Sequence, residues 1–183
     1  MRQVSAVDAG EHAMPAFRGS TPGQPGFADF YRAELPALIA LARALCGSAA
    51  AEDIAQEAML AAYRRWDEVE RFEEPHAWVR RTCANLAISA FRRRLVELRA
   101  LARLSARPVA TPLPDDSAEA FWSAVRSLPR RQAQCAALRY LYSMTGAEIA
   151  LTLDISEGAV KAHLARGKEA LATTLDVDKE AQR

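Results

Sequence analysis

The sequence has few of the residues that metal sites and disulfide frameworks require. Its 183 residues include three cysteines and three histidines. A zinc site needs cysteine or histidine pairs at short spacing, and no such pair occurs. Cys46, Cys83 and Cys135 are odd in number, far apart and set in apolar helical patterns, which is typical of reduced cysteines used as small core residues. We therefore predict no metal site and no cofactor.

The sequence also lacks long apolar runs and strand-like alternation. No run approaches the roughly 18 apolar residues that a membrane span needs. The N-terminus lacks the basic start and continuous apolar core of a secretory signal, so we expect a cytoplasmic chain that makes no membrane contact itself. No segment alternates with period two, so we predict no sheet. No convergent acid, base and nucleophile set is present, so we predict a protein that is not an enzyme and has no catalytic residue.

The whole chain has almost no excess of charge of one sign, although parts of it do. The 24 basic and 23 acidic residues leave a net charge of +1, which argues against a uniformly basic, nucleic-acid-binding coat. Residues 52–74 are predominantly acidic, whereas the many arginines of residues 80–107 are opposed only by Glu97. An acidic face and a basic face therefore adjoin in the first half of the protein.

Hydrophobic residues, 50% of the chain, recur at helical spacing in two stretches. We expect three helices within residues 27–105. Gly47 ends the first, Ser48 caps the second, and Pro75 is the first residue of the third. A second helical unit covers residues 118–175. The predicted fold class is all-α, with two small helical domains joined by a flexible linker.

The remaining segments have no sustained apolar period. Residues 1–26 are rich in glycine and proline, and we predict a disordered N-terminal extension. Residues 106–117 contain three prolines and are expected to form the flexible linker. Residues 176–183 are expected to form a short tail.

The stretch "TGAEIALTLDISEGAVKAHLARGKEAL", residues 145–171, fits a helix-turn-helix. Its apolar residues fall where two short helices that cross at a steep angle must bury side chains, and Ser156 is placed to cap the second helix. The outward surface of that second helix is the one that a recognition helix presents to the major groove. A helical hairpin with merely solvated basic residues is the alternative. Six residues make up the outward surface: Glu157, Gly158, Lys161, Ala162, Ala165 and Arg166.

Arginines in and before this motif suit two kinds of DNA contact. Arg166 is the residue best equipped to bind a guanine edge with two hydrogen bonds. Arg130, Arg131 and Lys168 suit phosphate contacts, which set the docking angle but carry no sequence information.

Three segments in order carry a resemblance to a known family. They are "AEDIAQEAMLAAYRRW" (51–66), "HAWVRRTCANLAISAFRRR" (76–94) and, after the proline-rich linker, "LPRRQAQCAALRYLY" (128–142), which leads into the helix-turn-helix. Together they resemble bacterial sigma factors of the extracytoplasmic-function type, group IV of the sigma-70 superfamily. The resemblance covers about residues 27–175.

The resemblance implies a function and partners. It implies an alternative sigma factor that binds core RNA polymerase and directs promoter-specific initiation through the minus 10 and minus 35 elements. Residues 27–105 would be sigma region 2 and residues 118–175 sigma region 4. The implied partners are core polymerase, through its beta-prime coiled coil and beta flap, and promoter DNA, with an anti-sigma factor as a further candidate.

The resemblance also implies site residues. The loop "DEVERFEE", residues 67–74, is the expected wall of a pocket for a flipped base. Expected contacts to core polymerase are Asp53, Gln56, Glu57 and Arg64. Expected contacts to the minus 10 element are Arg80, Asn85, Arg92 and Arg93. Expected contacts to the minus 35 element are Arg130, Glu157, Gly158, Lys161, Ala162 and Arg166.

The chain departs from the family pattern at several positions. Ala84 and Ser89 stand where an arginine before the asparagine and an aspartate after it are usual. Ala162 and His163 stand where a serine and an arginine are common. Asp154 replaces the usual glycine of the turn, and aspartate tolerates the left-handed backbone conformation better than most residues do.

A function from another class also fits the helix-turn-helix. A stand-alone repressor or activator could use an N-terminal helical bundle to dimerise or to sense a ligand. Such a protein would bind palindromic duplex DNA without polymerase. The acidic helix beside an arginine-rich helix favours the polymerase subunit.

Overall fold

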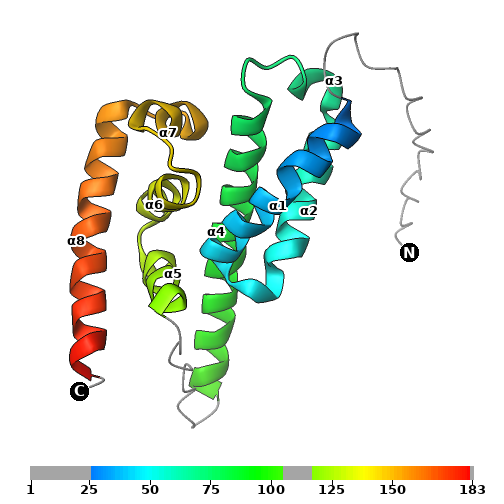
Figure 1. Cartoon of the computed structure of the whole chain (residues 1–183). Helices are drawn as coiled ribbons and strands as arrows, with labels where there is room; N and C mark the ends of the chain where they lie inside the picture. The colour runs from blue at the N-terminus through cyan, green and yellow to red at the C-terminus, as the bar shows by residue number, and fades with distance from the viewer. Residues whose placement is uncertain (1–25, 105–116, 182–183) are drawn as a thin grey trace, which may run out of the picture.

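The computed structural model describes residues 26–104 and 117–181. The predicted N-terminal extension and linker lie almost entirely outside these ranges. Within them the regular structure is helical and contains no strand, as predicted (Figure 1). No helix in these ranges is long and apolar enough to cross a membrane.

The first unit consists of three long helices and two short ones. α1 (Phe27–Cys46) ends at Gly47, whose φ of 84° lies in the left-handed region that favours glycine. α3 (Trp66–Val69) follows α2 (Ala51–Arg64), and α4 (Pro75–Leu104) begins at the predicted proline. The prediction that Ser48 caps α2 is wrong. Ser48 instead begins the short 3-10 helix η1 (Ser48–Ala50), and α2 has no side-chain cap.

Small residues allow the long helices of the first unit to pack closely. Ala55 and Ala58 of α2 are completely buried, as are Leu38 of α1 and Val79 and Cys83 of α4. An alanine at a helix contact lets the backbones approach, and the larger side chains then fill the space above and below it. The apolar stripes seen in the sequence therefore form one core between α1, α2 and α4.

The second unit consists of four helices, α5 (Ser117–Ser127), α6 (Arg130–Tyr142), α7 (Gly146–Leu153) and α8 (Glu157–Ala181). α8 contacts each of the other three. α5 begins at Ser117, inside the expected linker, and α8 continues past residue 175 into the expected tail.

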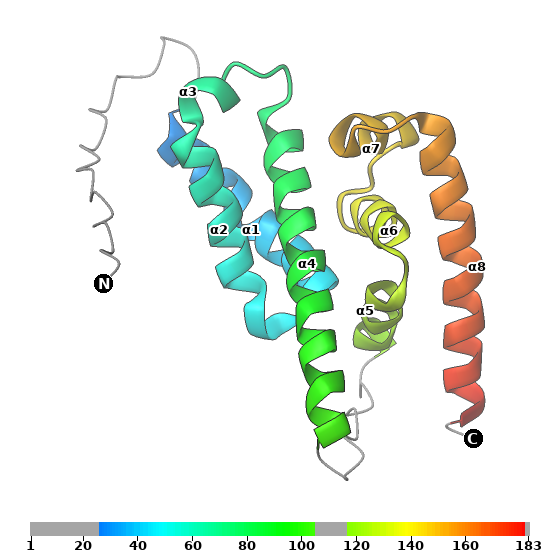
Figure 2. The ribbon, with the colours of Figure 1, turned by 180° about the vertical axis from the view of Figure 1, so that it is seen from behind.

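The two units pack against each other. α1 and α4 of the first unit both face the second unit, whereas α2 lies on the side away from α8 (Figures 1 and 2). α5 and α6 contact α1, and α7 contacts α4. Ala84 and Ile88, on the side of α4 away from Val79 and Cys83, are buried as well. The buried apolar residues of both units form one continuous cluster, which the division into two domains did not predict.

Candidate functional site

The outward surface of α2 carries the side chains expected to contact polymerase. Asp53, Gln56, Glu57 and Arg64 are all exposed, while Ile54, Ala55, Ala58 and Met59 of the same helix are buried. An acidic side chain in the first turn of a helix interacts favourably with the positive end of the helix dipole, so Asp53 also stabilises α2.

Leu60, which was not among the predicted contacts, is part of the same surface of α2. It follows Glu57 by three residues and precedes Arg64 by four, which is the spacing of neighbours on one helix face. Its side chain is 45% exposed. A single exposed leucine is common on protein surfaces, but here it adds an apolar contact to the charged surface of α2. The helical spacing from Asp53 could have identified it.

The expected pocket wall, residues 67–74, spans α3 and the turn that leads into α4. Beneath it the ring of Trp66 packs against Phe27 and Phe30 at centroid distances of 5.3 and 5.0 Å. The indole N–H of Trp66 is buried and has no hydrogen-bond partner among the described residues. Arg65 forms an ion pair with Glu68 at 2.6 Å, which ties the end of α2 to α3.

Arg80 on α4 is engaged inside the protein. Its Nε donates to Oε1 of Glu34 at 2.5 Å and its Nη2 donates to Oε2 at 3.1 Å. The side chain of Glu34 is only 5% exposed, so the ion pair is nearly desolvated. His76 Nδ1 lies 2.9 Å from the same carboxylate, and the Arg80 guanidinium lies 4.6 Å from the ring centroid of Tyr142. A role for Arg80 at DNA stays a prediction, because DNA would have to compete with Glu34.

Asn85 and Arg130, expected at two different promoter elements, are brought together by the structure. The amide oxygen of Asn85 accepts a hydrogen bond from Arg130 Nη2. It accepts a second from Gln134 Nε2 at 2.9 Å. Arg92 and Arg93 lie farther along α4, well before its end at Leu104, and both are exposed.

The helix-turn-helix is built by two local caps. At the start of α7, the Thr145 hydroxyl accepts from the Glu148 N–H, and the Glu148 carboxylate accepts from the Thr145 N–H and hydroxyl. These bonds, the one from the backbone N–H first, lower the pKa of Glu148. At the start of α8, the Ser156 hydroxyl accepts from the Ala159 N–H at 3.2 Å, as predicted. Ile149, Leu153 and Val160 are buried between the helices.

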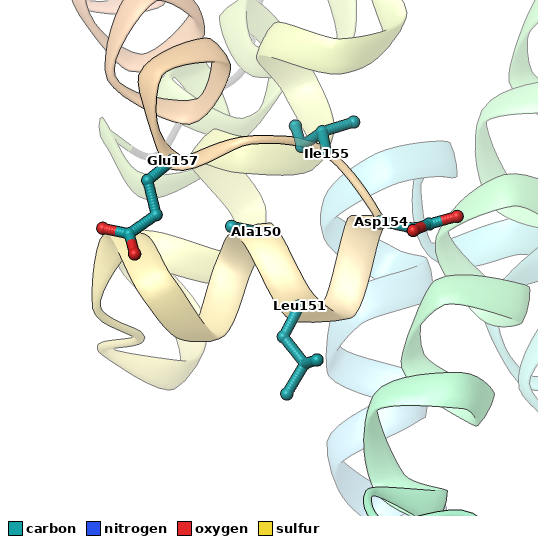
Figure 3. A pocket seen from close by; sticks show the side chains of 5 residues that line it. All are labelled: Ala150, Leu151, Asp154, Ile155 and Glu157. Carbon is teal, nitrogen blue, oxygen red and sulfur yellow. The ribbon is translucent and has the colours of Figure 1, made fainter.

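The turn between α7 and α8 contains Asp154 in the left-handed conformation, with φ 55° and ψ 59°. A shallow hollow is lined by this turn and by Ala150, Leu151 and Glu157. Figure 3 shows Asp154 pointing toward α4 and Leu151 pointing away from the protein. The Asp154 carboxylate lies 3.3 Å from Nη1 of Arg81 on α4.

The start of α8 presents the predicted DNA-reading residues. Glu157, Gly158, Lys161 and Arg166 are exposed. The first three line a second hollow together with Arg139 and Leu164. Ala162 is only partly exposed.

His163 turns away from the predicted DNA-reading surface. It is partly buried, and its Nδ1 atom is inaccessible and has no hydrogen-bond partner among the described residues. The side chain that stands where the family commonly has an arginine therefore does not extend the basic outward surface of α8.

The two candidate surfaces lie on opposite sides of the protein. α8 runs along the outer side of the second unit, and α2 lies on the far side of α4 from it (Figures 1 and 2). The described residues contain no group of three or more His, Cys, Asp and Glu side chains that could hold a metal ion. The three cysteines are buried and unpaired, and burial raises the pKa of Cys83 to about 12 and of Cys135 to about 11.

Comparisons with known proteins agree with this architecture. Residues 30–95 match the sigma-70 region 2 family, and residues 118–171 match the family described as sigma-70, region 4. No curated protein sequence matches the chain closely enough to count as a relative.

Two solved structures share the fold. The sigma factor RpoE of Bartonella quintana, solved with the anti-sigma factor NepR, is 24% identical, with a TM-score of 0.63 over 83% of this chain and 98% of that one. CnrH, solved with the cytosolic domain of CnrY, is 23% identical, with a TM-score of 0.60 over 83% of this chain and 88% of that one. Regions 2 and 4 follow each other in the order that the sequence motifs predicted. The chain therefore belongs to the sigma-70 family, as a sigma factor that carries regions 2 and 4 in that order.

Proposed function

We propose that this sigma factor works in the cytoplasm through three separate surfaces. The outward surface of α2 binds core RNA polymerase, α4 with the preceding loop engages the minus 10 element, and the start of α8 reads the minus 35 element. Residues 27–105 act as the first functional unit and residues 118–175 as the second. The protein makes no covalent bond itself, because its part is to bind polymerase and to choose the promoter.

The observation that carries this proposal is the exposed surface of α2. Asp53, Gln56, Glu57, Leu60 and Arg64 form a polar stripe with one apolar residue on a helix whose other side is buried. These side chains are exposed and are therefore accessible to a partner protein. A charged rim around an apolar contact is the usual composition of a protein interface.

The arginines and the α8 surface support the DNA-binding part. Arg92 and Arg93 are exposed on α4 and suit a single strand's phosphates, because stacking and backbone contacts must offset the few kcal/mol lost when a base is flipped. Lys161 and Arg166 are exposed on α8 and suit the major groove. Glu157, Gly158 and Ala162 lie on the same surface of α8, and Arg130 suits a contact to a neighbouring phosphate of the DNA.

An anti-sigma factor completes the proposed set of partners. RpoE of Bartonella quintana was solved with one. We propose that this chain is held by a partner of the same kind until polymerase is needed. The stand-alone repressor or activator is not favoured, because both sigma-70 regions are present in order.

The α2 surface can be tested directly. Asp53→Ala combined with Glu57→Ala should weaken binding of the full chain to purified core polymerase by at least about tenfold, as loss of central interface residues usually does. The matched control is Asp29→Ala with Glu169→Ala, which removes the same two charges from exposed positions on α1 and α8. Equal binding by both variants, with both folded, would show that α2 is not the polymerase-binding surface.

A further inference from the structure

The exposed surface of α2 becomes more apolar toward the end of the helix. Leu60 is 45% exposed and Tyr63 is 41% exposed. They are three residues apart, so they are neighbours on one helix face, and the exposed Glu57 lies one turn before them on the same face. One exposed apolar side chain is ordinary, but two adjacent ones beside a carboxylate offer a partner both an apolar and a charged contact. We call Glu57, Leu60 and Tyr63 the end patch of α2.

The start of α1 extends the end patch with further aromatic side chains. The Phe27 ring packs on Tyr63 at a centroid distance of 5.0 Å, on Trp66 at 5.3 Å and on Tyr31 at 6.0 Å. These separations are within the range of favourable aromatic pairs. Phe27 and Tyr31 are only partly buried. The first turn of α1 therefore lies directly beside the end of α2 (Figure 2).

The segment that precedes α1 joins the described structure at this place. Gly26 is the first described residue, and its carbonyl oxygen accepts hydrogen bonds from the N–H groups of Asp29 and Phe30. Phe17 lies nine residues before Gly26, and an extended chain of that length spans up to about 30 Å. α2 has 14 residues and is therefore about 21 Å long. Phe17 is thus within reach of the whole end patch.

The composition of residues 1–25 complements the end patch. Phe17 is the one aromatic residue of this segment, and Arg18 follows it directly. An aromatic ring beside a guanidinium matches apolar side chains beside a carboxylate, because the ring packs on the apolar part while the guanidinium pairs with the carboxylate. The segment is rich in glycine and proline and predicts no core of its own in which Phe17 could be buried.

We infer that residues 1–25 bind the end patch of α2 in the free chain, through Phe17 and Arg18, and that core polymerase must displace them. The inference rests on the proposed function, because it takes the exposed surface of α2 as the polymerase-binding surface. A tethered segment has an effective concentration on the order of 1 mM, so a contact with a Kd near that value forms within one chain although it is too weak to join separate molecules. If the end patch is free for about one third of the time, the affinity for polymerase falls about threefold.

The affinity of the full chain for purified core polymerase tests this competition. Phe17→Ser combined with Arg18→Ser should bind core polymerase about threefold more tightly than the wild type does. The matched control is Val4→Ser with Arg2→Ser, which removes one apolar and one basic side chain from the same segment and should bind as the wild type does. Thermal unfolding checks that the three proteins are equally stable. Wild-type affinity in the Phe17 and Arg18 variant would overturn the inference.

A photo-crosslinker at position 17 tests the contact itself without polymerase. p-Benzoylphenylalanine in place of Phe17 should label α2 near Leu60 and Tyr63 within the same chain, as located by peptide mass spectrometry, and added core polymerase should suppress the label. The same group in place of Val4 should label α2 much less. No label on α2, or a label that joins two chains, would overturn the inference.

The two tests separate this inference from the proposed function. The crosslink forms in the free chain, so its absence contradicts only the binding of residues 1–25 to the end patch. A failure of α2 as the polymerase-binding surface appears instead with Asp53→Ala and Glu57→Ala, whose binding to core polymerase would then equal that of their control.

Discussion

The buried carboxylate of Glu34 on α1 forms an ion pair with Arg80 of α4, whose side chain is 21% exposed. Removing one partner of such a pair leaves a desolvated charge without compensation, which destabilises a protein far more than the loss of a surface pair. We expect Glu34→Gln to lower the free energy of unfolding by about 2 kcal/mol, because Arg80 retains some solvent and one acceptor remains. Denaturation in urea measures this change.

The control for Glu34 is the exposed pair of Asp29 and Arg32, whose side chains are 64% and 71% exposed. Asp29→Asn should change the free energy of unfolding by less than about 0.5 kcal/mol. Equal effects of the two substitutions would contradict a structural role for the buried pair.

The cap at the start of α8 should contribute to the stability of the helix-turn-helix. Ser156→Ala removes the acceptor of the Ala159 N–H and should lower the free energy of unfolding by about 1 kcal/mol. Ser156→Thr should restore most of that loss. Ser123→Ala at an exposed position within α5 should be nearly neutral, and the three variants are compared by thermal unfolding.

Arg166 should choose bases rather than supply general affinity. Arg166→Ala is expected to reduce discrimination at one base pair of the upstream element by about 1 to 3 kcal/mol. Arg166→Lys keeps the charge but loses the two-bonded geometry, so it should retain affinity better than specificity. Competition binding of polymerase holoenzyme to promoters changed one base pair at a time measures both. An unaltered preference in Arg166→Ala would remove this residue from the reading surface.

The buried thiols should make the fold sensitive to high pH. Burial raises the pKa of Cys83 from the ordinary value of 9.0 to about 12. As the pH rises, the unfolded chain therefore releases this proton before the folded chain does. The contribution of the buried Cys83 thiol to the free energy of unfolding is complete below about pH 9 and is lost as the pH rises toward 12. Urea denaturation as a function of pH should show stability falling above about pH 9, and Cys83→Ala should flatten that decline. The same slope in the wild type and in Cys83→Ala would contradict the assignment.

The sequence predicted those features that local patterns determine. Gly47 ends α1 and Pro75 begins α4 because each has a backbone preference that acts at its own position. Ser156 caps α8 because a serine directly before the first helical residue can accept a hydrogen bond from a backbone N–H of the first turn. The prediction for Ser48 was wrong because the short 3-10 helix η1 lies between Gly47 and α2, so the residue directly before α2 is Ala50. The order of the two sigma-70 regions also followed from local motifs.

The sequence did not predict how the two units meet. Contacts such as Asn85 with Arg130 and Tyr142 with Ala37 join residues far apart in the chain, and no periodic pattern encodes such pairs. Ala84 and Ile88 were not among the residues of α4 predicted to face inward, yet both are buried. The ion pair of Arg80 with Glu34 could not be predicted from the sequence, because the two residues lie in different helices.

The measurement that tests the central claim most directly is transcription in vitro with purified core RNA polymerase, this chain and a set of bacterial promoter fragments. We predict transcripts from a restricted set of promoters when both proteins are present, and none from those promoters with either protein alone. Core polymerase that neither binds the chain nor gains promoter specificity from it would contradict the assignment as a sigma factor.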